Sequence, residues 1–188
     1  MWSLLRRARS FRALVGTQFL GAFNDNAFKQ LVLLMIPVEL MGRLEGGGPP
    51  WISEHPYATA YGHMLPNTLF SLPFVLFGAL TGSLADRVSK TVVIRGANLM
   101  EVAVMALALG AFILQSYELI LVCVFLMGTQ SAIFGPSKYG VIPELIEEKD
   151  ISQGNALIQV TTFMAIIFGV VVGGQLLEIF SDNLVIPG

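Results

Sequence analysis

Five long apolar segments, separated by shorter polar connections, divide this chain. They are dominated by Leu, Val, Ile, Phe, Ala and Met, and cover approximately residues 11–40, 64–84, 91–114, 118–134 and 155–180. At ~1.5 Å of rise per residue, helices of these lengths can cross a hydrocarbon layer of ~30 Å. The pattern therefore predicts an all-α fold, a polytopic membrane helix bundle.

Two charged residues, Asp25 and Lys29, interrupt the first segment near the membrane midplane. Ionised groups at that depth normally face a protein interior or a wet cavity and have a partner. Their spacing of four residues favours a pair on one helix face, which Gln18 continues. The residues predicted to line a substrate or ion pathway are Gln18, Asn24, Asp25, Asn26 and Lys29. The alternative is a structural pair that locks this helix to its neighbours.

A further charged group at membrane depth is Glu101, ~15 Å inside the third segment at helical rise. Asn98 stands three residues before it on the same helix face, and Arg95 stands one turn before Asn98. We predict Glu101 as a further pathway residue, in a proton or cation relay with Asp25. A structural hydrogen bond to a neighbouring backbone is the alternative.

The composition supports an integral membrane protein, with 54% hydrophobic and 13% charged residues. An ordinary soluble domain is less apolar and carries about twice that share of charge. The single cysteine, Cys123, excludes an intrachain disulfide. No catalytic residue, metal site, cofactor or nucleic-acid partner is predicted.

Basic residues predict the orientation, because they concentrate on the cytoplasmic side of membrane proteins. With the N-terminus in the cytoplasm, Arg43 alone lies outside and Lys29 lies within the bilayer. The basic residues that then lie inside are Arg6, Arg7, Arg9, Arg12, Arg87, Lys90, Arg95, Lys138 and Lys149. We therefore predict a cytoplasmic N-terminus.

Small residues and prolines predict local packing. Close helix approach is expected at three small-xxx-small pairs: Gly78 with Gly82, Gly128 with Ala132, and Gly169 with Gly173. Near the end of the fourth segment, we expect Pro136 to end the regular helix and Pro143 to begin a short surface helix.

The connection between the second and third segments, Gly82-Ser-Leu-Ala-Asp86-Arg87-Val-Ser-Lys90, resembles the signature loop of the major facilitator superfamily. One departure is Ser89, where the family has glycine. The resemblance implies a transporter fold in which this loop is a conformational latch between two lobes. The implied latch residues are Gly82, Asp86, Arg87 and Lys90. The alternative for these charges is an ordinary positive-inside loop.

Two further runs, residues 18–29 and 134–145, are similar to the lysophospholipid transporter branch of that superfamily, and the similarity continues through residues 154–157. Members of this branch move lysophospholipids, chiefly monoacyl glycerophosphoethanolamine, from the outer to the inner leaflet of the bacterial inner membrane for reacylation. Some versions are fused ahead of a glycerophospholipid acyltransferase and an acyl-carrier-protein ligase.

This substrate suits the predicted polar stripe. Lys29 can meet a phosphate, Asp25 an ammonium group or a coupling cation, and Asn24 and Asn26 can donate hydrogen bonds to glycerol or phosphate oxygens. Lys138 is a candidate for the lipid head group, although an interfacial lysine that snorkels is the commoner case. The expected partners are the bilayer, the lysophospholipid, the second transporter lobe, and an acyltransferase as partner or fusion.

We expect residues 1–188 to be a partial N-terminal lobe, with five of its six helices, that does not transport alone. Transport of another amphipathic small molecule is an alternative, as is the membrane portion of a bifunctional acyltransferase and acyl-carrier-protein ligase. A non-transporting membrane anchor is a third class, which the buried charges disfavour. The chain itself holds no His-x4-Asp acyltransferase motif and no nucleotide-binding loop, so it is predicted not to be an enzyme.

Overall fold

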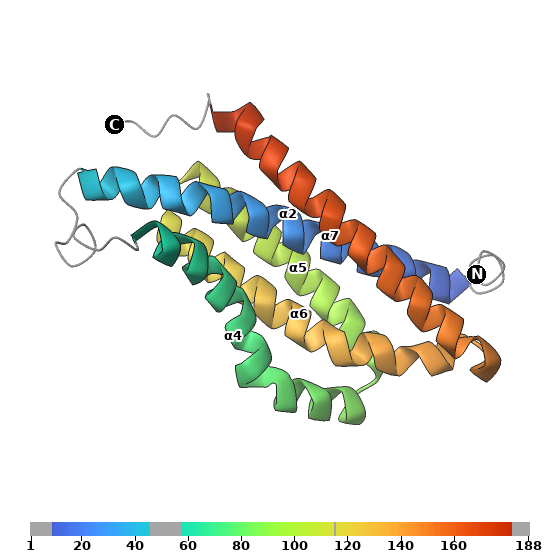
Figure 1. Ribbon diagram of the computed structural model, residues 1–188. Coiled ribbons are helices and arrows are strands. Elements are labelled where there is room, and N and C mark those ends of the chain that lie inside the picture. Colours follow the sequence, from blue (N-terminus) through green and yellow to red (C-terminus); the bar gives the residue numbers. More distant parts are fainter. Residues whose placement is uncertain (1–8, 46–57, 115, 182–188) are drawn as a thin grey trace.

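The computed structural model describes residues 9–45, 58–114 and 116–181, which form long helices without a strand. The elements are α2 (Arg9–Glu45), α4 (Ala58–Arg87), α5 (Lys90–Ile113), α6 (Tyr117–Leu145), the short 3-10 helix η1 (Glu148–Asp150) and α7 (Ile151–Ser181). The predicted all-α bundle is confirmed. Helix α2 packs mainly against α7 and α4, while α6 packs against α4 and α5 (Figure 1).

Four stretches of the described helices are long and apolar enough to cross a membrane: Met64–Ser83, Lys90–Ile113, Tyr117–Leu145 and Glu148–Ile179. Helix α2 has the length to do so, but polar residues such as Asp25 and Lys29 interrupt its apolar sequence. The chain is therefore a multi-pass membrane protein whose first described helix has a distinctly polar middle.

Prolines lie inside two helices of this bundle without ending them. Helix α6 continues through Pro136 and Pro143 to Leu145, so the predicted helix end at Pro136 and the predicted short helix from Pro143 are both wrong. Helix α4 contains Pro66 and Pro73 and is visibly bent (Figure 1). A proline removes one backbone donor, and neighbouring helices compensate for that loss inside a membrane bundle.

Glycines allow two of the predicted close helix contacts. A Cβ atom at Gly128 would overlap the backbone carbonyl of Phe70 on α4. Cβ atoms at Gly169 and Gly173 would overlap the backbone of α2 at Phe23 and Ala27. Gly78 and Gly82 have no neighbour within 4 Å among the described residues, so neither makes the predicted close contact with that part of the chain.

The buried apolar side chains form two separate clusters. Cluster 1 joins α2, α5 and α6, and its members are Phe28, Val32, Met35, Val104, Ala108, Ala111, Ile120, Cys123, Val124 and Met127. Cluster 2 joins α2, α6 and α7, and its members are Phe11, Leu14, Val15, Val141, Ile142, Leu157 and Ile158. Along α2 the clusters leave residues 16–27 between them, and along α6 they leave residues 128–140. Most polar side chains in the middle of both helices fall in this interval.

Candidate functional site

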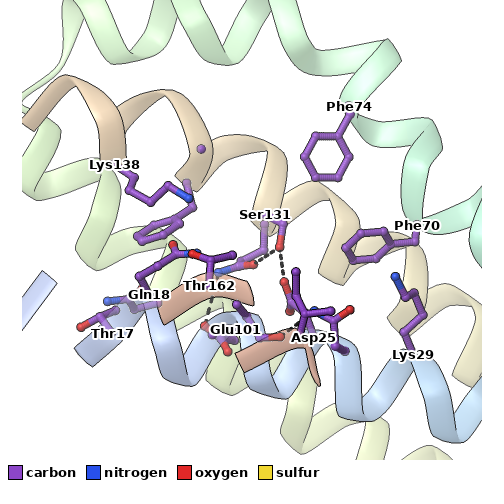
Figure 2. A pocket seen from close by; sticks show the side chains of 18 of the residues that line it. Thr17, Gln18, Asp25, Lys29, Phe70, Phe74, Glu101, Ser131, Lys138 and Thr162 are labelled. Carbon is purple, nitrogen blue, oxygen red and sulfur yellow. Dashed lines mark hydrogen bonds between the residues drawn. The ribbon is translucent and has the colours of Figure 1, made fainter. Parts of the chain in front are cut away.

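A cavity of about 460 Å³ occupies the interval between the two apolar clusters. All five long helices contribute to its wall, and α2 and α6 contribute most of the polar groups (Figure 2). The lining residues are Thr17, Gln18, Gly21, Ala22, Asp25, Asn26, Lys29, Phe70, Phe74, Asn98, Glu101, Gln130, Ser131, Phe134, Gly135, Lys138, Tyr139, Thr162 and Ile166. Its charged groups are two carboxylates and two amines, so the formal charges of the wall balance.

Asp25 is held by a neutral partner. The hydroxyl of Ser131 donates to Oδ2 of Asp25 at 2.5 Å, while Oδ1 is buried and has no hydrogen-bond partner among the described residues. Within the described helices no ion pair joins Asp25 to Lys29, although their spacing favoured one. A buried carboxylate oxygen without a donor is costly in an apolar surrounding. Asp25 therefore has an acceptor position available for a ligand.

Glu101 is also held by neutral donors. Asn24 Nδ2 on α2 donates to Oε1 at 3.1 Å, and Gln130 Nε2 on α6 approaches Oε2 at 3.4 Å. Gly21 makes room for this carboxylate, because a Cβ atom there would lie 3.3 Å from Oε2 of Glu101. The alternative prediction for Glu101, a hydrogen bond to backbone, is not what the structure shows.

The two carboxylates belong to one polar network. Ser131 Oγ, which donates to Asp25, also lies 3.1 Å from Oε1 of Gln130, and Gln130 reaches Glu101 (Figure 2). Polar groups therefore lie between the two ends of the predicted relay, although the one Ser131 hydroxyl proton can be donated to Asp25 or to Gln130 Oε1 and not to both. Its use as a relay remains a prediction.

Both amines of the cavity face aromatic rings. Lys29 Nζ lies 4.9 Å from the centroid of the Phe70 ring. Lys138 Nζ lies 5.9 Å from the Phe134 ring and 4.6 Å from the Tyr139 ring. Neither amine has an ion-pair partner in the part of the chain that the structure describes. Since an ammonium group has three donors and no acceptor, both remain able to bind an anion.

Two amides complete the polar wall on α2. Gln18 Nε2 donates to Oγ1 of Thr162 at 2.9 Å, which ties α2 to α7. Asn26 lines the cavity but donates to the carbonyl of Ala22 in its own helix at 2.7 Å. Asn24 is not part of the lining and acts on the cavity through Glu101.

The structure gathers most of the predicted pathway residues around one space. Gln18, Asp25, Asn26, Lys29 and Glu101 line the cavity, and so does Lys138, which is only 8% exposed.

Residues that the prediction missed lie on α2 itself and on the facing helices: Thr17, Gln130, Ser131 and Thr162, together with the rings of Phe70, Phe74, Phe134 and Tyr139. The run Thr129-Gln130-Ser131 inside an apolar segment was a usable signal, because polar residues at membrane depth usually face the bundle interior. The aromatic residues gave no comparable signal, since a phenylalanine in an apolar segment can equally well face lipid.

The predicted latch residues lie away from the cavity. Lys90 Nζ forms an ion pair of 2.6 Å with Glu144 Oε1, which joins the start of α5 to the last turn of α6. Arg87 is exposed, and the side chain of Asp86 lies outside the described residues. The latch role of these residues stays a prediction.

Comparisons with known proteins agree with this architecture. The family model described as Major Facilitator Superfamily matches residues 14–185. The lysophospholipid transporter LplT of Photorhabdus laumondii is 30% identical over 89% of this chain and 36% of its own length. LplT of an Escherichia coli O1:K1 strain and of Shigella boydii serotype 18 are each 26% identical over 95% of the chain and 38% of their own length. The comparison with solved structures gave no significant match.

Proposed function

Because the chain belongs to the Major Facilitator Superfamily, we propose that it forms most of the N-terminal lobe of a lysophospholipid transporter. The chain spans little more than a third of the length of the curated relatives described above. The second lobe would supply the opposite wall of the transport path. The location proposed is the bacterial inner membrane, with the N-terminus in the cytoplasm.

The observation that carries the proposal is the charged cavity between two apolar clusters. A lysophospholipid such as lysophosphatidylethanolamine has a phosphate, an ammonium group and one acyl chain. The amines of Lys29 and Lys138 suit the phosphate, and the open acceptor of Asp25 suits the ammonium group. The rings of Phe70 and Phe74 offer an apolar wall for the start of the chain.

The relatives support the substrate class, since those described above are lysophospholipid transporters by name. Transport toward the cytoplasmic leaflet would deliver the lysolipid to an acyltransferase, as partner or fusion, for reacylation. The chain itself would be part of a transporter and not an enzyme.

The test is uptake of labelled lysophosphatidylethanolamine by proteoliposomes that contain the protein from the complete reading frame. We expect uptake by the wild type and a loss of about tenfold or more in Asp25→Asn, because the amide keeps the shape of the carboxylate and loses its charge. Asp150→Asn, at the end of η1 and outside the cavity, is the matched control and should transport like the wild type.

Unchanged uptake in Asp25→Asn would remove Asp25 from the mechanism. Wild-type protein that ignores lysolipids but carries another amphipathic compound would replace the substrate assignment and leave the transporter fold in place.

A further inference from the structure

The two amines of the cavity lie at its opposite ends. Lys29 is the last polar lining position of α2, beside Phe28 of cluster 1, and Lys138 is the last charged lining position of α6 before the cluster 2 residues Val141 and Ile142. Figure 2 shows them on either side of the hydrogen bond between Ser131 and Asp25. Each amine therefore stands where the polar interval meets an apolar cluster.

Helix geometry gives the distance between Lys29 and Lys138 along the bundle. The hydrogen bond between Asp25 and Ser131 sets the two residues at the same level of α2 and α6. Lys29 lies four residues beyond that level on α2, and Lys138 lies seven residues beyond it on α6, in the opposite direction. At ~1.5 Å per residue, their backbones are about 16 Å apart along the bundle. The two Nζ atoms also contact different aromatic rings, Phe70 for Lys29 and Tyr139 for Lys138.

We propose that the cavity has two separate phosphate-binding positions, one at Lys29 and one at Lys138, which the head group of a lysophospholipid occupies in turn. This inference rests on the proposed function and adds the order in which the two lysines bind the phosphate. With the N-terminus in the cytoplasm, Lys29 lies toward the outer leaflet and receives the phosphate first. Lys138 lies toward the cytoplasmic leaflet and receives it second.

The contacts of Lys29 fit such a transient site. Its amine has no carboxylate partner among the described residues, although Asp25 stands one turn away and its Oδ1 has no donor. A contact between an ammonium group and a phenylalanine ring is weaker than a charge-assisted hydrogen bond to phosphate. A phosphate entering from that end can therefore draw the amine from the Phe70 ring.

Phe70 is itself held in place, so the Lys29 position is defined by packing. Its backbone carbonyl lies against Gly128 of α6, where no side chain would fit. The carboxylates between the two amines repel a phosphate and disfavour a resting place midway. This arrangement of charges favours a phosphate at either lysine and disfavours it between them.

The experiment compares transport in the two directions, using the protein from the complete reading frame in proteoliposomes of one orientation. Lysophosphatidylethanolamine is supplied either to the leaflet on the Lys29 side or to the leaflet on the Lys138 side. We expect Lys29→Met to raise KM about tenfold only from the Lys29 side, and Lys138→Met to do so only from the Lys138 side. Lys29→Arg, which keeps the charge, should restore most of the affinity.

Two controls separate this inference from a structural role. Lys149→Met removes an exposed amine of η1, outside the cavity, and should behave like the wild type from both sides. Monoacylglycerol, which lacks a phosphate, should bind to Lys29→Met and to the wild type with equal affinity.

Three results would overturn the two positions. The KM of Lys29→Met for lysolipid could rise equally from both sides, or it could stay unchanged from both sides. Lys29→Met could also lose affinity for monoacylglycerol as much as for the lysolipid. In each case wild-type uptake of lysolipid would leave the proposed function standing. Wild-type protein that neither binds nor transports lysolipid would overturn both proposals.

Discussion

At the scale of single residues, both carboxylates of the cavity are bound by neutral donors. Asp25 accepts from Ser131, and Glu101 accepts from Asn24 and approaches Gln130. These donors come from helices other than the one that carries the acid, so each carboxylate joins two or three helices. The amides of Asn24 and Gln130 have no other acceptor than Glu101 among the described residues, so this carboxylate contributes to packing as well as to the cavity wall.

Removal of the Glu101 carboxylate should therefore destabilise the bundle. We expect Glu101→Ala to lower the free energy of unfolding by about 1–3 kcal/mol, because the amides of Asn24 and Gln130 lose their acceptor. Glu101→Gln retains an acceptor and should lose less than about 1 kcal/mol. Thermal unfolding in detergent measures both.

Glu148→Ala is the control, since Glu148 is exposed in η1, and its effect should stay within about 0.5 kcal/mol. Equal stability of the Glu101→Ala and Glu148→Ala variants would show that the network around Glu101 contributes nothing to folding.

At the scale of elements, backbone contacts decide how the helices approach. Helix α7 crosses α2 where Gly169 and Gly173 face the backbone of residues 23–27, which is the segment that carries Asp25 (Figure 1). Helix α4 meets α6 where Gly128 faces Phe70. No hydrophobic effect drives helices together in lipid, so such close contacts supply much of the association. Both contacts also set the position of cavity residues.

The neighbouring glycines Gly173 and Gly174 provide a direct test of this packing. A Cβ atom at Gly173 would overlap the carbonyl of Ala27, whereas one at Gly174 meets nothing within 4 Å among the described residues. We expect Gly173→Ala to destabilise by about 1–3 kcal/mol. Gly174→Ala should be neutral or stabilising by up to about 1 kcal/mol, as for an unhindered glycine within a helix. Thermal unfolding should separate the two variants, and identical melting curves would contradict the close contact between α7 and α2.

At the scale of the whole molecule, polar and apolar layers alternate along the bundle. The cavity lies between cluster 1 and cluster 2, and the ion pair of Lys90 with Glu144 lies beyond cluster 2, where α5 begins and α6 ends. Charges at that end suit the edge of a membrane, where head groups and water are available. The layering places the cavity at membrane depth and cluster 2 between it and the predicted cytoplasmic side.

The predicted orientation can be tested by cysteine accessibility. In a Cys123→Ala background, Leu114→Cys should react with an impermeant thiol reagent added outside the cell, because residue 114 follows the end of α5. Lys149→Cys should react only after the membrane is permeabilised, because residue 149 lies in η1 between α6 and α7. Both positions are exposed, so burial does not confuse the result. The reverse pattern would place the N-terminus outside.

The sequence alone determined the fold class, the approximate helices and the polar stripe of α2. These are local properties: apolar length sets whether a segment can span a membrane, and a charged residue inside such a segment must face the bundle interior. The family resemblance also rested on local runs, and the family match over residues 14–185 confirmed it. The prolines of α6 misled the prediction, because a local rule for helix ends ignores the neighbours that a bundle supplies.

Which polar groups contact one another depends on how the helices pack. Asp25 is bound by Ser131 and not by Lys29, and Lys29 faces Phe70 from a different helix. Helical spacing predicts which residues share a face of one helix. The partner of a side chain depends on how neighbouring helices cross and on where a glycine lets them approach. Those contacts are non-local, so the pairing of charges and rings around the cavity follows from packing and not from the order of residues along α2.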